Sequence, residues 1–291
     1  MQRIDFITKD NVYLHGILYD APSKEKVIIA VHGMGSDVFR DRKAAIAQKA
    51  SEKQISYFCF NNRGHDFVNY IKRKKDGKLK DELCGSAYED VLDSYYDILG
   101  AVQKMIELGY KNIYLQGHSL GCTKIVYTYN KMMQENNQVL EKIKAIALLS
   151  FLDMPSLFKI YLGERYLEKL EYAENQENVK YAMMPFDSFV NPISVKTFLR
   201  YNKYNEEIDF AKHGEKEYNY EKLNNIKVPL FMRWGNNNEF IQIPADKLSK
   251  KISEKLDNKN KDVGFIDGAD HHYTGKENKM AEELIAFIDK N

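Results

Sequence analysis

The chain lacks an excess of basic charge and lacks long apolar runs, the features that mark nucleic-acid-binding and membrane-spanning proteins. Its 43 basic and 42 acidic residues leave a formal net charge of +1, whereas binding to nucleic acid or to an anionic membrane surface requires clustered, uncompensated Lys and Arg. No apolar run approaches the length of a transmembrane helix, and residues 1–10 contain no basic segment followed by an apolar stretch. We therefore expect a cytoplasmic protein with no nucleic-acid partner and no stable membrane insertion.

Patterns that bind metals or cofactors are also scarce. The three cysteines, Cys59, Cys84 and Cys122, form neither a CxxC pair nor the dense framework of a small secreted protein, so we expect reduced thiols. The histidines outside the motifs described below lack ligand spacing with carboxylates or cysteines. The phosphate loop GxxxxGK[ST] is missing, as is GxGxxG after the first parallel strand. The sequence predicts no cofactor and no metal.

What the chain does contain is an alternation of short apolar runs and amphipathic segments. The apolar runs are 27–31, 55–60, 113–115, 145–149, 228–232 and 263–266. Runs of this kind are typical of strands buried on both faces of a parallel sheet. Before them, residues 2–8 and 12–19 alternate apolar and polar positions, which predicts an antiparallel hairpin. We expect a doubly wound, mostly parallel, eight-stranded α/β sheet with its ligand site at the carboxyl ends of the strands.

The alternation is interrupted once, after the fourth parallel run. Residues 151–221 are rich in Tyr, Phe, Lys and Glu and contain helical patterns but no strong strand pattern. Because this segment leaves the sheet after a strand's carboxyl end, we interpret it as a helical cap or lid inserted into a core of residues 1–150 and 222–291. Its aromatic side chains either line a pocket or pack the cap on the core. A shorter basic run, residues 72–80, is expected to be a solvated loop.

The strongest motif is Gly-His-Ser-Leu-Gly at residues 117–121, which matches GxSxG between a predicted strand and a helix-like segment. A nucleophile elbow requires this context, because its sharp turn brings neighbouring backbones so close that small residues must flank the serine. The pattern predicts Ser119 as an exposed nucleophile, with the amino end of the following helix favouring developing negative charge. We interpret His118 as a packing or hydrogen-bonding residue, since adjacent side chains diverge at such a turn.

A serine hydroxyl needs a base to accept its proton, and residues 268–273 read Gly-Ala-Asp-His-His-Tyr between the last predicted strand and the terminal helix. With these two motifs the sequence resembles the α/β-hydrolase superfamily, particularly its small esterases and lipase-like hydrolases. The resemblance implies that His271 is the catalytic base, in preference to His272. It also implies that the backbone amides of Leu120 and Met34, the latter just after a His-Gly pair, form the oxyanion hole.

The third member of the expected triad departs from the family pattern. The family usually carries Asp in a segment similar to GxxD after the seventh strand, where this chain has Asn238. An amide could orient an imidazole but would stabilise the imidazolium less than a carboxylate. Glu239, the next residue, is our first choice for the acid, and Asp153 after the sixth strand is the alternative. Asp270 is too close in sequence to the base and is expected to fix its loop.

These residues favour a serine hydrolase, most of all a carboxylesterase that cleaves a small or medium acyl ester through an acyl-enzyme on Ser119. Its partner would be a small-molecule ester. The same triad serves thioesterases, lipases and acyltransferases, and these alternatives stay open. A non-catalytic binding protein is the alternative outside enzymes; the Asn at position 238 suits it, but the retained Ser and His do not. A resemblance in fold supports the reaction class and leaves the substrate and the oligomeric state open.

Overall fold

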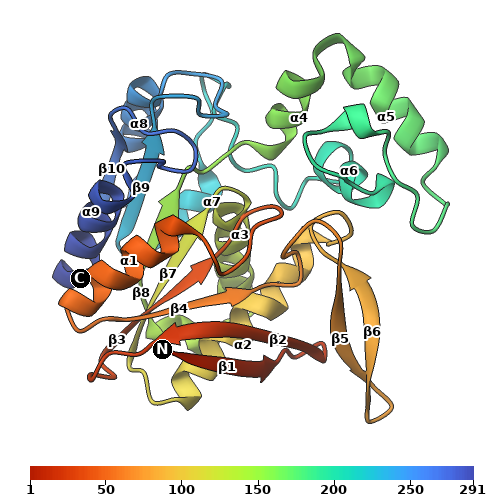
Figure 1. Ribbon diagram of the computed structural model, residues 1–291. Coiled ribbons are helices and arrows are strands. Elements are labelled where there is room, and N and C mark those ends of the chain that lie inside the picture. The colour runs from red at the N-terminus through yellow and green to blue at the C-terminus, as the bar shows by residue number, and fades with distance from the viewer.

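The computed structural model describes residues 1–291, and its centre is one mixed sheet of ten strands (Figure 1). The strands are β1 (Gln2–Ile7), β2 (Val12–Tyr19), β3 (Lys26–Val31), β4 (Ser56–Asn61), β5 (Asn69–Lys75), β6 (Lys78–Cys84), β7 (Asn112–His118), β8 (Ile143–Leu149), β9 (Leu230–Gly235) and β10 (Lys261–Ile266). Their order is β10-β9-β8-β7-β3-β4-β2-β5-β6, with β1 also paired to β2. The six strands from β10 to β4 are mutually parallel, and β2 pairs antiparallel with β4. The prediction of a mostly parallel α/β sheet with an antiparallel opening hairpin is confirmed.

Helices cover both faces of the sheet (Figure 1). They are α1 (Asp41–Glu52), α2 (Ser94–Glu107), α3 (Leu120–Gln134), α4 (Met154–Leu162), α5 (Tyr166–Asn175), α6 (Val195–Asn202), α7 (Glu221–Asn224), α8 (Ala245–Lys255) and α9 (Glu277–Lys290). Helices α1 and α9 pack together on one face, while α2 and α3 pack together on the other. None of these helices is both long and apolar enough to cross a lipid bilayer.

Strand β3 shows why the apolar runs become central strands. Its successive side chains point to opposite faces: Ile28 and Ala30 join the core beneath α1 and α9, whereas Ile29 and Val31 join the larger core beneath α2 and α3. All four are almost completely buried. A strand with two buried faces cannot carry alternating polar residues, so its sequence is continuously apolar.

The predicted number of eight strands is wrong, because residues 69–84 form the additional hairpin β5–β6. This corrects the expectation of a solvated loop over the basic run. The hairpin turns at Asp76-Gly77, where both residues have positive φ angles, as a tight hairpin turn requires. Opposite charges face each other across it, as in the ion pair between Lys72 and Asp81. Both faces are largely exposed, so the strands lack the apolar pattern that revealed the others.

Helices α4, α5 and α6 lie together, beyond the carboxyl ends of the strands, on the connection between β8 and β9 (Figure 1). Most of the buried aromatic rings of this segment pack on one another. The Phe158 ring lies 4.5 Å from that of Phe189, 5.4 Å from Phe198 and 5.7 Å from Tyr201, between centroids. The same side chains belong to the large apolar core shared with the sheet. The aromatic residues between β8 and β9 therefore mainly pack this connecting segment.

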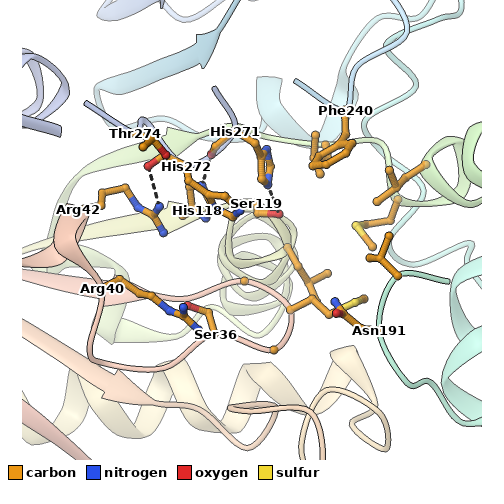
Figure 2. A pocket seen from close by; sticks show the side chains of 18 of the residues that line it. Ser36, Arg40, Arg42, His118, Ser119, Asn191, Phe240, His271, His272 and Thr274 are labelled. Carbon is orange, nitrogen blue, oxygen red and sulfur yellow. Dashed lines mark hydrogen bonds between the residues drawn. The ribbon is translucent and has the colours of Figure 1, made fainter. Parts of the chain in front are cut away.

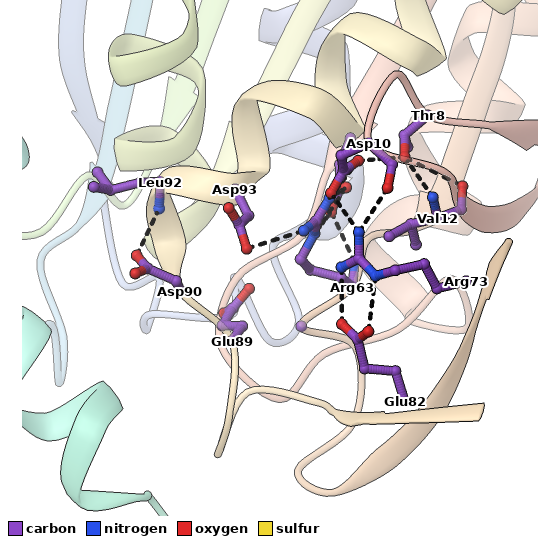
Figure 3. A network of polar contacts seen from close by, with 12 residues as sticks. Thr8, Asp10, Val12, Arg63, Arg73, Glu82, Glu89, Asp90, Leu92 and Asp93 are labelled. Carbon is purple, nitrogen blue, oxygen red and sulfur yellow. Dashed lines mark hydrogen bonds and ion pairs between the residues drawn. The ribbon is translucent and has the colours of Figure 1, made fainter. Parts of the chain in front are cut away.

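A buried ion-pair network fixes the loop after β4 (Figure 3). The guanidinium of Arg63, whose side chain is 2% exposed, lies 2.7 Å from the fully buried carboxylate of Asp97 and 3.0 Å from the carboxylates of Asp10 and Asp93. The backbone N–H of Arg63 also donates to Asp97. The network joins the opening hairpin, the β4 loop and helix α2.

Replacing Arg63 with methionine is expected to lower the free energy of unfolding by about 3–5 kcal/mol, because it leaves the Asp97 carboxylate buried without a counter-charge. Urea unfolding monitored by circular dichroism measures the change. Arg3→Met is the matched control, since that arginine is exposed and pairs only with Asp5, and exposed ion pairs contribute little to stability. Equal destabilisation by the two substitutions would contradict the structural importance of the network.

Candidate active site

The loops that follow the parallel strands meet at one edge of the sheet and bring distant parts of the sequence together. Ser119 follows β7, Glu239 follows β9, and His271 follows β10. The segment Gly33–Met34 follows β3 and lies against the turn that carries Ser119. Figure 2 shows Ser119 near the middle of the pocket, with the His271 ring pointing toward it.

The turn at Ser119 has the strained geometry expected of a nucleophile elbow. Ser119 has φ 56° and ψ −127°, values that non-glycine residues rarely adopt. A Cβ atom on Gly121 would lie 2.2 Å from the carbonyl oxygen of Val31, and one on Gly117 would lie 2.8 Å from the amide nitrogen of Cys122. Both positions therefore require glycine. The tight packing of β3, β7 and α3 holds the serine at the end of its strand.

Three side chains form a continuous hydrogen-bonded chain. Ser119 Oγ lies 3.0 Å from His271 Nε2, and His271 Nδ1 lies 2.8 Å from Glu239 Oε2. The side chains of His271 and Glu239 are 8% and 2% exposed. With Nδ1 donating to the carboxylate, Nε2 is left free to accept the serine proton. The geometry is that of a nucleophile, a base and an orienting acid.

The second carboxylate oxygen of Glu239 is also hydrogen-bonded. Its Oε1 accepts a hydrogen bond from Ser150 Oγ at 2.5 Å and one from the backbone N–H of Gly235 at 3.1 Å. The Phe240 ring lies against His271, with 5.1 Å between centroids. Sequence reasoning missed Ser150. Its position directly after the apolar run 145–149 was the available signal, because polar residues there reach the same edge as the nucleophile.

The other two positions considered for the acid, Asn238 and Asp153, make no hydrogen bond with the His271 imidazole. Asn238 is exposed, has a left-handed backbone with φ 53°, and makes no hydrogen bond to His271. Asp153 caps helix α4 through the amide and hydroxyl of Ser156 and accepts from Gln242. The loop after β9 thus presents its carboxylate one residue later than the family pattern.

Two further residues shape the loop around His271. Asp270 accepts from the backbone amides of His272 and Thr274 at 2.9 Å and 2.8 Å. His272 makes no hydrogen bond to Ser119; its ring is exposed at the pocket wall. His118 Nε2 donates to the carbonyl oxygen of His271 at 2.7 Å, and burial holds the pKa of His118 well below its ordinary value. A neutral His118 therefore positions the backbone of His271.

The two candidate oxyanion donors lie beside the nucleophile. A Cβ atom on Gly33 would lie 3.0 Å from Ser119 Cβ and 3.4 Å from the amide nitrogen of Leu120, so the strand end that carries Met34 abuts the turn. The Met34 amide makes no hydrogen bond within the chain, and the Leu120 amide belongs to the first turn of α3, where helix N–H groups have no intrahelical partner. Both residues border the cavity that contains Ser119.

A cavity of about 490 Å³ opens over these groups. Its walls come from the β3 loop, the start of α1, the nucleophile turn, the inserted segment and the loop after β10. The lining residues are Gly33, Met34, Gly35, Ser36, Arg40, Asp41, Arg42, Phe67, His118, Ser119, Leu120, Leu152, Met154, Leu157, Phe189, Val190, Asn191, Phe240, His271, His272, Thr274 and Glu277. The inserted segment contributes mainly apolar side chains, whereas the start of α1 contributes charged ones.

Comparison with known proteins supports the architecture. No family model and no curated protein sequence matches the chain. Solved structures match it over nearly its whole length. The ferulic-acid-bound esterase Est1E from Butyrivibrio proteoclasticus is 16% identical with a TM-score of 0.67, covering 97% of each chain. Alpha/beta hydrolase domain-containing protein 10 from mouse is 14% identical with a TM-score of 0.61, covering 100% of this chain and 98% of that one. This chain has the α/β-hydrolase fold.

A third similar structure is the esterase Pf2001 from Pyrococcus furiosus, at 16% identity and a TM-score of 0.60, covering 99% of this chain and 90% of that one. The α/β-hydrolase resemblance inferred from the two sequence motifs is therefore confirmed at the level of the fold. At such low identity the likeness carries no substrate with it, because one fold supports many activities.

Proposed function

We propose that the chain is a serine hydrolase, most specifically a carboxylesterase that acts on a small or medium acyl ester. The observation that carries the proposal is the hydrogen-bonded chain from Ser119 through His271 to Glu239, at 3.0 Å and 2.8 Å, on the floor of a cavity. A structural role alone would not require a serine in strained backbone with its hydroxyl facing a pocket. The esterases among the similar structures are consistent with this activity.

In the proposed mechanism, His271 Nε2 accepts the Ser119 proton as Ser119 Oγ attacks the carbonyl carbon of the ester. Glu239 holds the imidazole in the required tautomer and stabilises the imidazolium that forms. The charge on the tetrahedral intermediate develops on the former carbonyl oxygen, and the amides of Met34 and Leu120 donate to it. The intermediate collapses as His271 returns the proton to the leaving alcohol, and an acyl-Ser119 remains.

Water completes the cycle by the same route. His271 accepts a proton from water, the hydroxide attacks the acyl carbonyl, and the acid leaves as Ser119 regains its proton. We propose that residues 151–221 act as a cap over this site, supported by the contribution of Leu152, Met154 and Leu157 to the cavity wall. A cavity of about 490 Å³ suits a small-molecule ester. Est1E, a similar fold, binds ferulic acid, which is a small carboxylic acid.

Reaction with a fluorophosphonate probe tests the proposal, because the probe phosphonylates only an activated serine. We expect the wild-type protein to be labelled, with the added mass on the peptide that contains Ser119. His271→Ala is expected to lower the labelling rate by about 100-fold or more, since general-base catalysis contributes that much. The matched control is His272→Ala, which removes the neighbouring imidazole and should cause a much smaller loss. A folded wild-type protein that resists the probe, or is labelled at another serine, would contradict the proposal.

A further inference from the structure

Arg42 is a buried cation at the wall of the candidate active site. It occupies the first turn of helix α1, its exposed fraction is 6%, and it lines the same cavity as Ser119 and His271. Figure 2 shows Arg40 and Arg42 on one side of Ser119, with Phe240 and Asn191 on the opposite side. Buried arginines are almost always paired with a carboxylate, so the partners of Arg42 decide its role.

Arg42 has no such partner within the chain. No carboxylate oxygen lies within 4 Å of its guanidinium, and its one hydrogen bond is a long contact of 3.3 Å from Nη1 to the carbonyl oxygen of His272. A guanidinium carries five N–H donors, so most of these remain unused. Its Nε and Nη2 atoms are two of these unused donors. These two atoms form no hydrogen bond and are not completely enclosed, and Arg42 borders the cavity.

Three other charged side chains border the cavity with Arg42: one cation, Arg40, and two carboxylates, Asp41 and Glu277. Arg40 lines the same side of the cavity and pairs with Asp37 at 3.1 Å, with half of its side chain exposed. Asp41 is exposed and Glu277 is half-buried, and both border the cavity without reaching Arg42. Burial lowers the pKa of Arg42, but a guanidinium stays protonated in proteins. Arg42 is therefore a buried positive charge on the cavity wall that has no counter-charge within the chain.

The opposite wall of the cavity differs in character. The inserted segment contributes the side chains of Leu152, Met154, Leu157, Phe189 and Val190. These residues offer no charged partner, so an apolar part of a ligand fits there. Ser119 lies between the two walls (Figure 2). An ester bound at Ser119 would extend one part toward the cap and the other toward the arginines.

We infer that the substrate is an ester with one apolar part and one part that carries an anionic oxygen group, a carboxylate or a phosphate, which binds Arg42 with help from Arg40. This inference rests on the proposed function and specifies its substrate class. The planar guanidinium fork matches the two oxygens of such a group and forms charge-assisted hydrogen bonds with it. The anionic group takes no part in bond making. It positions the ester carbonyl over Ser119, while the apolar part occupies the cap side.

Matched esters test the inference through ratios of kcat/KM measured by pH-stat. On the alcohol side, para-carboxyphenyl butyrate and para-phosphonooxyphenyl butyrate are compared with the neutral para-carbamoylphenyl butyrate. On the acyl side, monoethyl adipate is compared with the ethyl ester of adipic monoamide. The wild-type protein is expected to prefer at least one anionic ester to its neutral partner by about tenfold or more, because hydrogen bonds to charged groups contribute that much. The pair with the largest ratio identifies both the anion and the side that carries it.

Variants then assign the preference to particular residues. Arg42→Gln is expected to lower the ratio of anionic to neutral kcat/KM by about tenfold, and Arg42→Lys by less, because lysine keeps the charge without the fork. Arg40→Gln, at an exposed position, should lower the ratio by a smaller factor and remains informative if Arg42→Gln does not fold. Glu277→Gln should raise it. Arg3→Gln, far from the cavity in β1, is the control that leaves the ratio unchanged.

Two outcomes overturn the inference. One is a wild-type protein that is labelled by the fluorophosphonate probe and hydrolyses the neutral esters, yet shows no preference for any anionic ester. The other is an equal loss on anionic and neutral esters in both Arg42→Gln and Arg40→Gln. In either case the proposed serine hydrolase activity stands. If the wild-type protein neither takes the label nor hydrolyses any ester, the proposed function fails and the inference fails with it.

Discussion

Replacing Ser119 with alanine is expected to lower kcat for ester hydrolysis by roughly 10⁴–10⁶-fold. The substitution removes only the hydroxyl oxygen that lies 3.0 Å from His271 Nε2. Without it no acyl-enzyme forms, and water must attack the bound ester directly. The remaining acceleration would come from the amides of Met34 and Leu120 and from substrate binding, which still assist the attack of water.

Initial rates on a neutral butyrate ester measure this effect, with circular dichroism to verify the fold. Ser51→Ala is the matched control, because Ser51 is an exposed serine on helix α1, remote from the cavity. It should keep the wild-type rate. Retention of more than about a tenth of the wild-type kcat in Ser119→Ala would show that the hydrolysis does not proceed through this serine.

Glu239→Gln is expected to lower kcat by about 10⁴-fold, as removal of the corresponding charge does in other triads. Glutamine keeps the shape of the side chain but replaces a carboxylate that accepts from His271 Nδ1 at 2.8 Å. A neutral amide stabilises the imidazolium poorly and can donate to Nδ1, which selects the wrong tautomer. Ser150 and the Gly235 amide now hold Oε1, so the amide nitrogen is directed toward the imidazole.

Two further variants separate Glu239 from its rivals. Asp153→Asn tests the alternative acid; an asparagine oxygen can still cap helix α4, because Asn and Asp are about equally good N-caps, so little change in stability or in kcat is expected. The double variant Asn238→Asp, Glu239→Gln tests the position favoured by the family pattern. It should remain inactive, because residue 238 is exposed and its backbone is left-handed. Recovery of activity in the double variant would place the acid at 238 after all.

The sequence was informative wherever the structure depends on local patterns. Strands such as β3 and β7 are buried on both faces, so their apolar runs predicted them directly. The charged hairpin β5–β6 was missed as structure, because it is exposed on both faces and is stabilised by cross-strand charges that have no periodic apolar signal. Only its Asp76-Gly77 dipeptide was a visible turn signal.

The candidate site divides in the same way. Ser119 and His271 could be proposed from short motifs, because the strand-to-helix turn and the loop before the last helix are local features. The choice of Glu239 over Asp153 and Asn238 rested on loop position alone. The structure brings Glu239 Oε2 within 2.8 Å of His271 and adds Ser150, which no motif marked. Nothing in the sequence indicated that Arg42 is a site residue, since a single arginine at the start of a helix is ordinarily solvated.

By itself, the sequence determined the α/β class, the positions of the central strands along the chain, and the two motifs around Ser119 and His271. It could do so because periodicity and turn chemistry act between near neighbours. Only the tertiary structure decided which carboxylate reaches the imidazole and which cation borders the cavity. Those contacts join residues from separate parts of the chain, 32 positions apart for Glu239 and His271 and 152 for Ser119 and His271. Their geometry depends on how the whole sheet packs, since the parallel strands end at one edge and their loops meet there.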